Sequence, residues 1–177
     1  GDVYDDSCAY AEKLAQERGS TFVHPFDDLD IVAGQGSIAM EIVQELPTVD
    51  YILAPVGGGG LITGVSTLAK MLNPKIKVIG VEPAAAPSMT MALASGEPVT
   101  LDSANTIADG TAVKRVGDRI FEYAKKNIDQ MVTVEDDELV GAFLDMVENH
   151  KMIVENSGLL TVAALKQLDL KGKKAVA

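Results

Sequence analysis

The sequence predicts an α/β fold, a three-layer sandwich in which helices cover a parallel β-sheet. Residues 51–56 are a continuous apolar run, and residues 77–82 have a second apolar run, Val78-Ile79-Gly80-Val81, between Lys77 and Glu82; both segments are typical of strands that are buried on both faces. A helical segment, residues 61–72, separates them, and a strand–helix–strand unit of this kind places its two strands parallel. Strand and helix patterns continue to alternate along the rest of the chain, which favours the layered α/β class.

The segment before the first apolar run is predicted to form two helices and one short strand. Residues 5–18 contain good helix formers, and Gly19 is a natural stop for that helix. Residues 21–23, with the sequence Thr-Phe-Val, are a strand candidate. Residues 36–46 place apolar side chains on one helical face, and Pro47 follows the last of them. We therefore expect a helix, a strand and a second helix before residue 51.

The segment after the second apolar run is predicted to hold further helices and one more strand. Thr133 and Asp136 have the spacing of a capping box, which would open a helix with Leu139, Phe143, Met146 and Val147 on one face. Residues 106–114 are expected to form a loop. The remaining predicted elements are helices over residues 88–94, 117–126 and 157–168 and a strand over residues 131–134.

The last residues, 173–177, resemble the beginning of a buried strand. Two lysines precede the short apolar run Ala-Val-Ala, whereas a strand usually runs for about 5–6 residues. We therefore expect that this chain is a portion of a longer polypeptide.

The overall charge excludes two classes of partner. The 177 residues include 15 Lys and Arg against 26 Asp and Glu, so the formal net charge is −11. A field of this sign repels phosphate backbones and anionic membrane surfaces, so we expect neither nucleic acid nor membrane as a partner. No apolar run reaches the length of about 18 residues that a membrane helix needs. The single cysteine, Cys8, permits no internal disulfide, and we expect a cytoplasmic protein.

Four consecutive glycines, Gly57, Gly58, Gly59 and Gly60, are the most informative feature of the sequence. They follow a buried strand and precede a helix, which is where open α/β sheets bind ligands. Backbone N–H groups without neighbouring Cβ atoms can converge on one point, and the helix dipole adds partial positive charge there. The loop therefore predicts a phosphate site. The alternative is a tight turn without a ligand, although a turn needs only one or two glycines.

The residues around this loop narrow the choice of phosphate ligand. A P-loop would need a lysine at the helix start, where this chain has Leu61 and Ile62. A dinucleotide site is a competitor because Glu82 ends the next strand, but Thr63 breaks the required glycine spacing. The remaining candidate is a cofactor with one terminal phosphate, and pyridoxal 5′-phosphate (PLP) is the obvious one.

Six motifs follow one another along the chain: His24-Pro25-Phe26-Asp27, Ala33-Gly34-Gln35-Gly36-Ser37-Ile38-Ala39, Pro55-Val56 with the four glycines and Leu61, Gly80-Val81-Glu82-Pro83, Ile107-Ala108-Asp109-Gly110 and Val154-Glu155-Asn156-Ser157-Gly158. In this order they resemble the serine/threonine dehydratase and serine racemase family, whose members are fold type II PLP enzymes. The resemblance covers nearly all of the chain, and Val116-Gly117-Asp118 followed by Phe121-Glu122 is particularly similar to bacterial short-chain threonine dehydratases. The fold is then expected to be part of the large cofactor domain of such an enzyme.

The resemblance assigns roles to particular residues. It implies that residues 57–60, with Leu61, hold the cofactor phosphate and that Glu155 lies near the cofactor ring, where a helix-capping role is the alternative. Asp109 and Gly110 would face the substrate, unless they form a simple turn. A divalent or monovalent cation would be held by Glu82, the backbone of Ala86, and Ser88, although relatives commonly carry aspartate at the last position.

The resemblance also implies what this chain lacks. The family's Schiff-base lysine belongs to a Ser-x-Lys-x-Arg-Gly type of motif, and no lysine of this chain lies in one. We therefore expect no catalytic residue in residues 1–177, which would form the C-terminal portion of the large domain without the small domain.

The activity that the resemblance implies is the dehydration and deamination of L-threonine or L-serine, giving 2-oxobutanoate or pyruvate and ammonia. The expected partners are the amino acid substrate and further copies of the same protein in a homo-oligomer. Serine racemase and threonine synthase are the alternatives within the family. A nucleotide-binding regulatory module is the alternative outside it.

Overall fold

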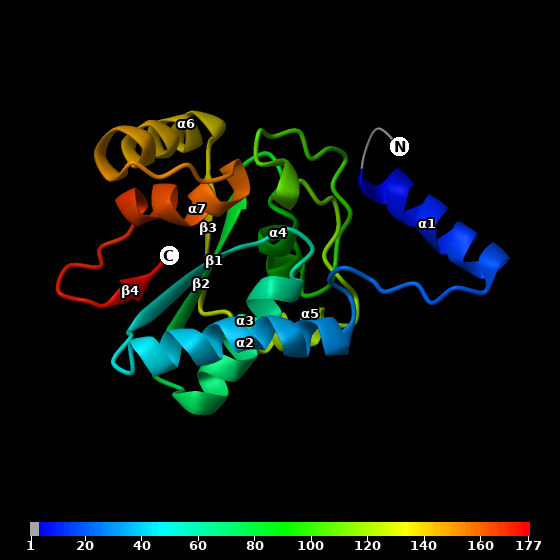
Figure 1. Ribbon diagram of the computed structural model, residues 1–177, viewed down its shortest axis with the longest axis horizontal. Helices are drawn as coiled ribbons and strands as arrows, with labels where there is room; N and C mark the ends of the chain where they lie inside the picture. Colours follow the sequence, from blue (N-terminus) through cyan, green and yellow to red (C-terminus); the bar gives the residue numbers. More distant parts are fainter. Residues whose placement is uncertain (1–3) are drawn as a thin grey trace.

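A four-stranded parallel β-sheet forms the centre of the computed structural model, which describes residues 4–177 (Figure 1). Tyr51 lies opposite Lys77 on one neighbouring strand and opposite Ala175 on the other. The predicted parallel sheet is confirmed, and so is the strand expected near the last residue. The strands are β1 (Tyr51–Pro55), β2 (Lys77–Pro83), β3 (Gln130–Val134) and β4 (Ala175–Val176), in the spatial order β3-β2-β1-β4.

The central strands contribute side chains to two separate cores, one on each face of the sheet. Ile52, Ala54 and Val78 pack into the first core, whereas Leu53 and Ile79 pack into the second. All five side chains are at most 4% exposed. Successive side chains of a strand point to opposite faces, so burial on both faces requires the continuous apolar runs seen in the sequence.

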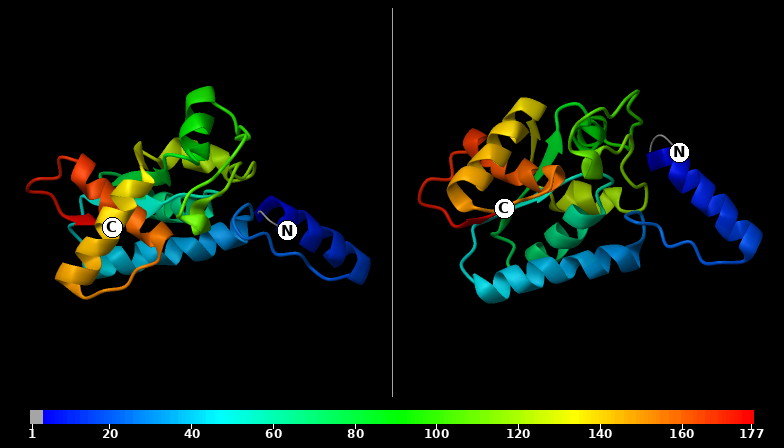
Figure 2. Two further views of the ribbon diagram at one scale, coloured as in Figure 1. Left: turned by 90° about the horizontal axis from the view of Figure 1, so that it is seen from above. Right: turned by 45° about the horizontal axis from the view of Figure 1, so that its top comes forward.

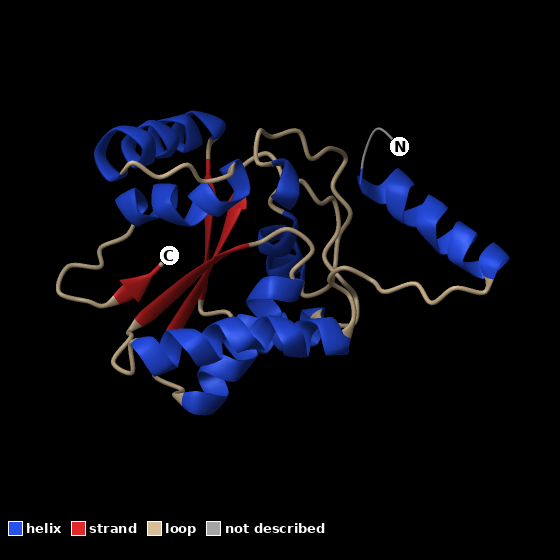
Figure 3. Ribbon diagram, viewed as in Figure 1, coloured by secondary structure: helices blue, strands red, loops and turns tan. Residues whose placement is uncertain are grey.

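Helices cover both faces of the sheet, which confirms the predicted three-layer sandwich (Figures 1 and 3). On one face lie α2 (Leu29–Glu45), α3 (Gly60–Leu72) and α5 (Phe121–Asn127), and on the other lie α6 (Asp136–Asp145) and α7 (Asn156–Ala164). None of the described helices is both long enough and apolar enough to cross a membrane.

Several shorter elements connect these layers. The helix α4 (Ser88–Ser95) follows β2 and contributes Met89 and Ala92 to the same core as α2 and α3. Residues 106–114 form the expected loop with one 3₁₀ turn in it. The single turns are the 3₁₀ segments Asp109–Thr111 and Leu165–Gln167 and the π segment Met146–His150.

Two helices begin at residues other than those predicted. The helix α2 starts at Leu29 rather than near Gly36, because the Asp28 side chain accepts a hydrogen bond from the Asp30 N–H at 2.8 Å and caps it. The helix α5 starts at Phe121 rather than at Gly117. Residues 118–120 form a turn instead.

The predicted start of α6 is also wrong, and its predicted apolar face is confirmed for Leu139 and Met146, which pack in one core. Thr133 belongs to β3, and the capping box is made by Glu135 and Glu138, whose carboxylate accepts from the Glu135 N–H at 2.9 Å. The buried residues of α6 are Leu139 and Ala142, while Phe143 is 37% exposed.

The helix α1 (Tyr4–Arg18) lies to one side of the sandwich, as both views of Figure 2 show. It confirms the first predicted helix. Residues 20–24, which lead from it to the sandwich, have no regular secondary structure and pair with no strand in the described part of the chain. The predicted strand over residues 21–23 is therefore wrong, because β-prone side chains do not form a strand without a partner.

Candidate functional site

A cavity of about 410 Å³ opens at the carboxyl end of β1 and brings most of the predicted site residues together. The glycine loop forms one wall, the 3₁₀ turn at residues 109–111 a second, and the start of α7 a third. Phe26 and Gln35 approach from the segment around the start of α2. The predicted residues in its lining are Gly57, Gly58, Gly59, Gly60, Leu61, Asp109, Gly110 and Glu155.

The glycine loop presents the N-terminus of α3 to this cavity. Gly59 is the N-cap residue with φ +98°, a conformation that side-chain-bearing residues rarely adopt, and α3 begins at Gly60. No side chain in the described part of the chain caps this helix. The first N–H groups of a helix have no partner within it, and the macrodipole makes that end positive. These donors and this partial positive charge suit an anion, and the phosphate site predicted from the sequence stays a prediction.

The loop is also packed closely against Phe26, which explains why glycine is needed at Gly58. A Cβ atom there would lie 2.4 Å from the Phe26 ring. The close approach accounts for part of the glycine-rich sequence without any ligand. Packing alone does not account for the uncapped N-terminus of α3, so the close approach of Phe26 and the predicted binding of a phosphate are compatible.

Glu155 is the N-cap residue of α7, the capping role that the sequence left as an alternative. Its carboxylate accepts a hydrogen bond from the Ser157 N–H at 3.3 Å. Because Glu155 also lines the cavity, contact with a cofactor ring stays a prediction. Asp109 and Gly110 lie in the 3₁₀ turn across the cavity, and their predicted contact with substrate stays a prediction as well.

Two hydroxyl groups of the cavity were not singled out by the sequence. Thr111 and Ser157 are both buried, and their side-chain oxygens lie 3.5 Å apart. The Thr111 hydroxyl donates to the Ala108 carbonyl at 2.9 Å. Ser157 belongs to the motif at residues 154–158, and Thr111 directly follows the motif at residues 107–110. Their place in or beside these motifs was the sequence feature that could have identified them.

Glu82 lies outside this cavity, completely buried below the start of α4. Its carboxylate accepts hydrogen bonds from the Met89 N–H at 2.6 Å, the Thr90 N–H at 2.9 Å and the Thr90 hydroxyl at 2.8 Å. Burial raises the pKa of Glu82 to about 7, and these hydrogen bonds oppose that rise.

The surroundings of Glu82 do not fit a cation. A hard cation needs oxygen lone pairs around it, whereas N–H and O–H donors already face both carboxylate oxygens. Ala86 and Ser88 are buried beside it, as the prediction required, and the Ser88 hydroxyl is 3.5 Å from the carboxylate. The predicted cation stays a prediction that these contacts do not support.

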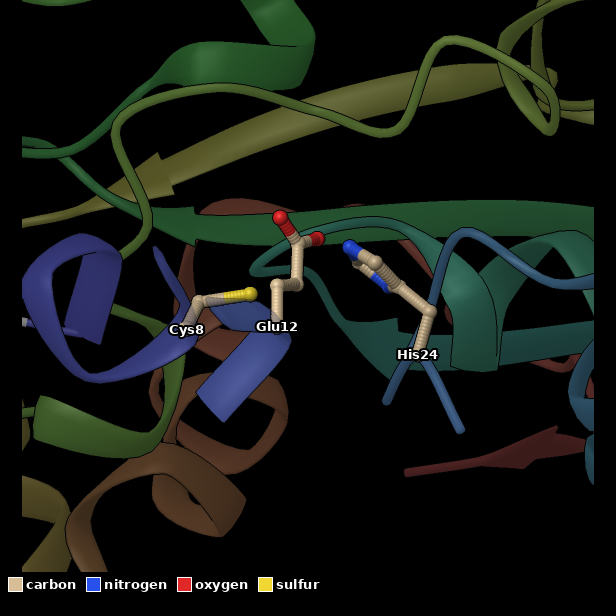
Figure 4. A group of neighbouring side chains, drawn as sticks. All are labelled: Cys8, Glu12 and His24. Carbon is tan, nitrogen blue, oxygen red and sulfur yellow. The ribbon is translucent and has the colours of Figure 1, made fainter. Parts of the chain in front are cut away.

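A second group with metal-ligating side chains lies where α1 meets the sandwich. Cys8, Glu12 and His24 have ligand atoms within 4.8 Å of one another, and the Glu12 carboxylate faces the His24 ring (Figure 4). The Nδ1 atom of His24 accepts a hydrogen bond from the Asp27 N–H at 2.9 Å, so Nε2 of the neutral ring carries the proton. To bind a metal through Nε2, the ring would need its lone pair on Nε2 and its proton on Nδ1, but Nδ1 already accepts the backbone N–H of Asp27. His24 therefore has the structural role expected for it.

Comparisons with known proteins are consistent with the geometry. An L-threonine ammonia-lyase of Thermotoga maritima is 45% identical over 175 residues, which are 98% of this chain. The structure of the processed form of threonine deaminase isoform 2 from Solanum lycopersicum superposes with a TM-score of 0.89 at 37% identity over 96% of this chain. Serine racemase from Dictyostelium discoideum superposes with a TM-score of 0.84 at 36% identity over 94% of it.

The chain corresponds to only a part of each of these proteins. It spans 44% of the Thermotoga maritima protein, 50% of the Solanum lycopersicum chain and 54% of the Dictyostelium discoideum chain. The family profile described as pyridoxal-phosphate dependent enzyme matches residues 1–177, the whole of the sequence. Together with the open N-terminus of α3 at the cavity, this match shows that the chain belongs to the pyridoxal-phosphate dependent enzyme family.

Proposed function

We propose that the full-length protein converts L-threonine, or L-serine, into 2-oxobutanoate, or pyruvate, and ammonia, and that this chain holds the phosphate of its PLP cofactor. The observation that carries the proposal is the uncapped N-terminus of α3, which opens into a cavity of about 410 Å³. The names of the relatives support the choice of reaction, since one with 45% identity is an L-threonine ammonia-lyase.

The residues of this chain would bind and orient rather than carry out covalent chemistry. The N–H groups of residues 58–61 would donate to the phosphate oxygens, and the α3 dipole would stabilise their negative charge. The turn at Asp109 and Gly110 would lie next to the substrate. PLP, when bound, supplies the electron withdrawal that makes the Cα–H bond of an amino acid acidic.

The lysine that binds PLP covalently would come from outside this chain. Within residues 4–177, no lysine lines the cavity. We therefore propose that these residues are the C-terminal portion of the large domain and that the small domain and the lysine segment lie elsewhere in the full-length protein. A homo-oligomer and a cytoplasmic location stay predictions of the sequence.

Serine racemase is the second candidate, because the racemase from Dictyostelium discoideum superposes almost as well as the threonine deaminase. One assay separates the two reactions. The purified full-length protein, loaded with PLP, is given L-threonine and L-serine in separate reactions, and ammonia, 2-oxo acids and D-serine are measured. We expect ammonia and 2-oxobutanoate in equal amounts from L-threonine. D-serine formed without ammonia would instead favour the racemase.

A further inference from the structure

The side chain of Asp27 accepts hydrogen bonds from backbone N–H groups that are more than ninety residues away in the sequence. Its Oδ1 atom accepts hydrogen bonds from the Arg119 N–H at 2.8 Å and the Ile120 N–H at 3.2 Å. These N–H groups belong to the turn that precedes α5, so Asp27 holds the turn between residues 117 and 121. The contact lies at the edge of the sandwich, beside the glycine loop.

Gly117, the residue directly before this turn, is hydrogen-bonded to the glycine loop. The Gly117 N–H donates to the Gly58 carbonyl at 3.0 Å. Gly117 is packed tightly on the aspartate, because a Cβ atom there would lie 2.5 Å from Asp27 Oδ1. Asp27 and Gly58 are thus connected through one short stretch of backbone.

The carbonyl of Gly58 determines where the next N–H group points. The peptide bond is planar and trans, so the Gly59 N–H points away from the Gly58 carbonyl. Because Gly117 holds that carbonyl, it also fixes the orientation of the Gly59 N–H, and Gly59 lines the cavity. The position of one amide at the proposed phosphate site therefore depends on the turn that Asp27 holds.

The segment that carries Asp27 is itself fixed from both sides. The His24 ring accepts the Asp27 N–H at 2.9 Å and the Phe26 N–H at 3.3 Å through Nδ1. Phe26 packs on the loop, since a Cβ atom at Gly58 or Gly60 would lie within 2.9 Å of Phe26 atoms. Asp27 therefore contacts the turn from a segment that already touches the glycine loop.

We propose that Asp27 is a positioning residue, which fixes the glycine loop through the turn at residues 117–120 and so arranges its amides for phosphate. This inference rests on the proposed function, because it takes the loop as the binding site for the phosphate of PLP. Preorganised donors bind more tightly, since no ordering is required at the moment of binding. Loss of the Asp27 contacts should therefore reduce the affinity for PLP without removing any atom that touches it.

The neighbouring residue provides a matched control. Asp28 is, like Asp27, a half-buried aspartate that accepts two backbone N–H groups, but it caps α2, and in the described part of the chain it makes no hydrogen bond with the turn or the glycine loop. Asp27→Ala and Asp28→Ala each remove an aspartate that accepts two backbone N–H groups. Both should lower the melting temperature of the full-length apoprotein by similar amounts.

The two variants should differ in their affinity for PLP. In titrations of the full-length apoprotein, we expect Asp27→Ala to raise the dissociation constant for PLP about tenfold. Asp28→Ala should leave it within about twofold of the wild type, since its contacts are independent of the loop. Asp27→Asn keeps an oxygen acceptor and should recover most of the affinity. Equal dissociation constants for the two alanine variants would overturn the proposal.

Two further measurements distinguish a failure of the proposal for Asp27 from a failure of the proposed function. If Asp27→Ala does not fold, Gly117→Ala replaces it, because the added Cβ would displace the aspartate, and an unchanged affinity for PLP would then overturn the proposal. The wild type is also titrated with pyridoxal, which has no phosphate. Tight binding of PLP and weak binding of pyridoxal would support the phosphate site. A wild type that binds neither would contradict the proposed function itself.

Discussion

Glu82 and Thr90 are joined by two hydrogen bonds, because the N–H group and the hydroxyl of Thr90 both donate to the same carboxylate of Glu82 at 2.9 and 2.8 Å. The Met89 N–H donates to the other oxygen at 2.6 Å. A carboxyl group from a strand of the sheet thus accepts hydrogen bonds from the first N–H groups of α4, since no residue of α4 itself caps the helix in the described structure.

Removing this carboxylate should destabilise the fold strongly. Glu82→Ala leaves several buried donors without an acceptor, and we expect the free energy of unfolding to fall by about 3 kcal/mol or more. Thr90→Val removes one of the donors instead and should cost only about 1 kcal/mol. Thermal and urea unfolding of the full-length protein would measure both. Similar losses of unfolding free energy for the two variants would show that the carboxylate contributes no more to stability than a single one of its donors.

The same site gives a prediction about metal removal. Because N–H and O–H donors satisfy the Glu82 carboxylate, we expect dialysis against a chelator to leave the melting temperature of the full-length protein unchanged. Adding back Mg²⁺, Ca²⁺ or K⁺ should also have no effect. A rise in melting temperature with one of these ions that Glu82→Gln abolishes would restore the cation predicted from the sequence.

Asp129 should make stability depend on acid pH. Burial acts to raise the pKa of Asp129, but hydrogen bonds from Lys70, Lys77 and the Val78 N–H outweigh it and hold the pKa below its usual value. A carboxyl group whose pKa is lower in the folded state stabilises the fold above its unfolded pKa. That contribution is lost as the pH falls below about 4.

The variant Asp129→Asn tests this dependence. At pH 7 it should lower the melting temperature, and the difference from the wild type should shrink as the pH is lowered through the acid range. Asp118→Asn is the control, because its ion pair with Arg115 is exposed and should contribute little at any pH. A difference between Asp129→Asn and the wild type that stays constant with pH would exclude this titration as its cause.

The strands were predictable because burial on both faces leaves a strong signal in the sequence. Residues 51–55 are a continuous apolar run, the strand 77–83 has the apolar run 78–81 at its centre, and the two-residue strand β4 was predicted from the last residues. The failed strand at 21–23 had suitable side chains, but a strand also needs a partner, which side-chain propensity cannot supply. The sequence therefore predicts central strands better than isolated ones.

The glycine loop was predictable for a similar reason, whereas the residues that hold it were not. Four glycines between a strand and a helix have few explanations, and the structure places them at the cavity. The Asp27 side chain accepts a hydrogen bond from the Arg119 N–H, and no local sequence pattern connects residues so far apart in the chain. The predicted helix began at Gly36, whereas α2 begins at Leu29, and Gly36 lies inside it, facing the α3 backbone near Gly64.

Two glycines within helices should respond oppositely to the same substitution. A Cβ atom on Gly141 of α6 meets nothing within 4 Å, so Gly141→Ala should stabilise the protein by about 0.5–1 kcal/mol. A Cβ atom on Gly64 of α3 would lie 2.3 Å from the Val32 carbonyl oxygen, so Gly64→Ala should force α2 and α3 apart and destabilise it. Urea unfolding of both variants gives the comparison. A gain in stability for Gly64→Ala would contradict the close crossing of these helices.

The charge preference of the glycine loop can be tested once space has been made for a side chain. Gly58→Asp alone would confuse charge with bulk, because any Cβ there collides with the Phe26 ring. We therefore expect Phe26→Ala combined with Gly58→Ala to be accommodated. The same background with Gly58→Asp adds only a carboxylate at the proposed phosphate site.

The two double variants should then differ greatly in their affinity for PLP. Like charges a few ångströms apart in a partly desolvated site repel by several kcal/mol at an effective dielectric constant near 20. A loss of about 3 kcal/mol corresponds to more than a hundredfold weaker binding, so the Asp variant should purify colourless. The Ala variant should stay yellow, and circular dichroism should show both folded. A yellow Asp variant with unchanged affinity would mean that the phosphate binds elsewhere and that residues 57–60 serve only as a turn.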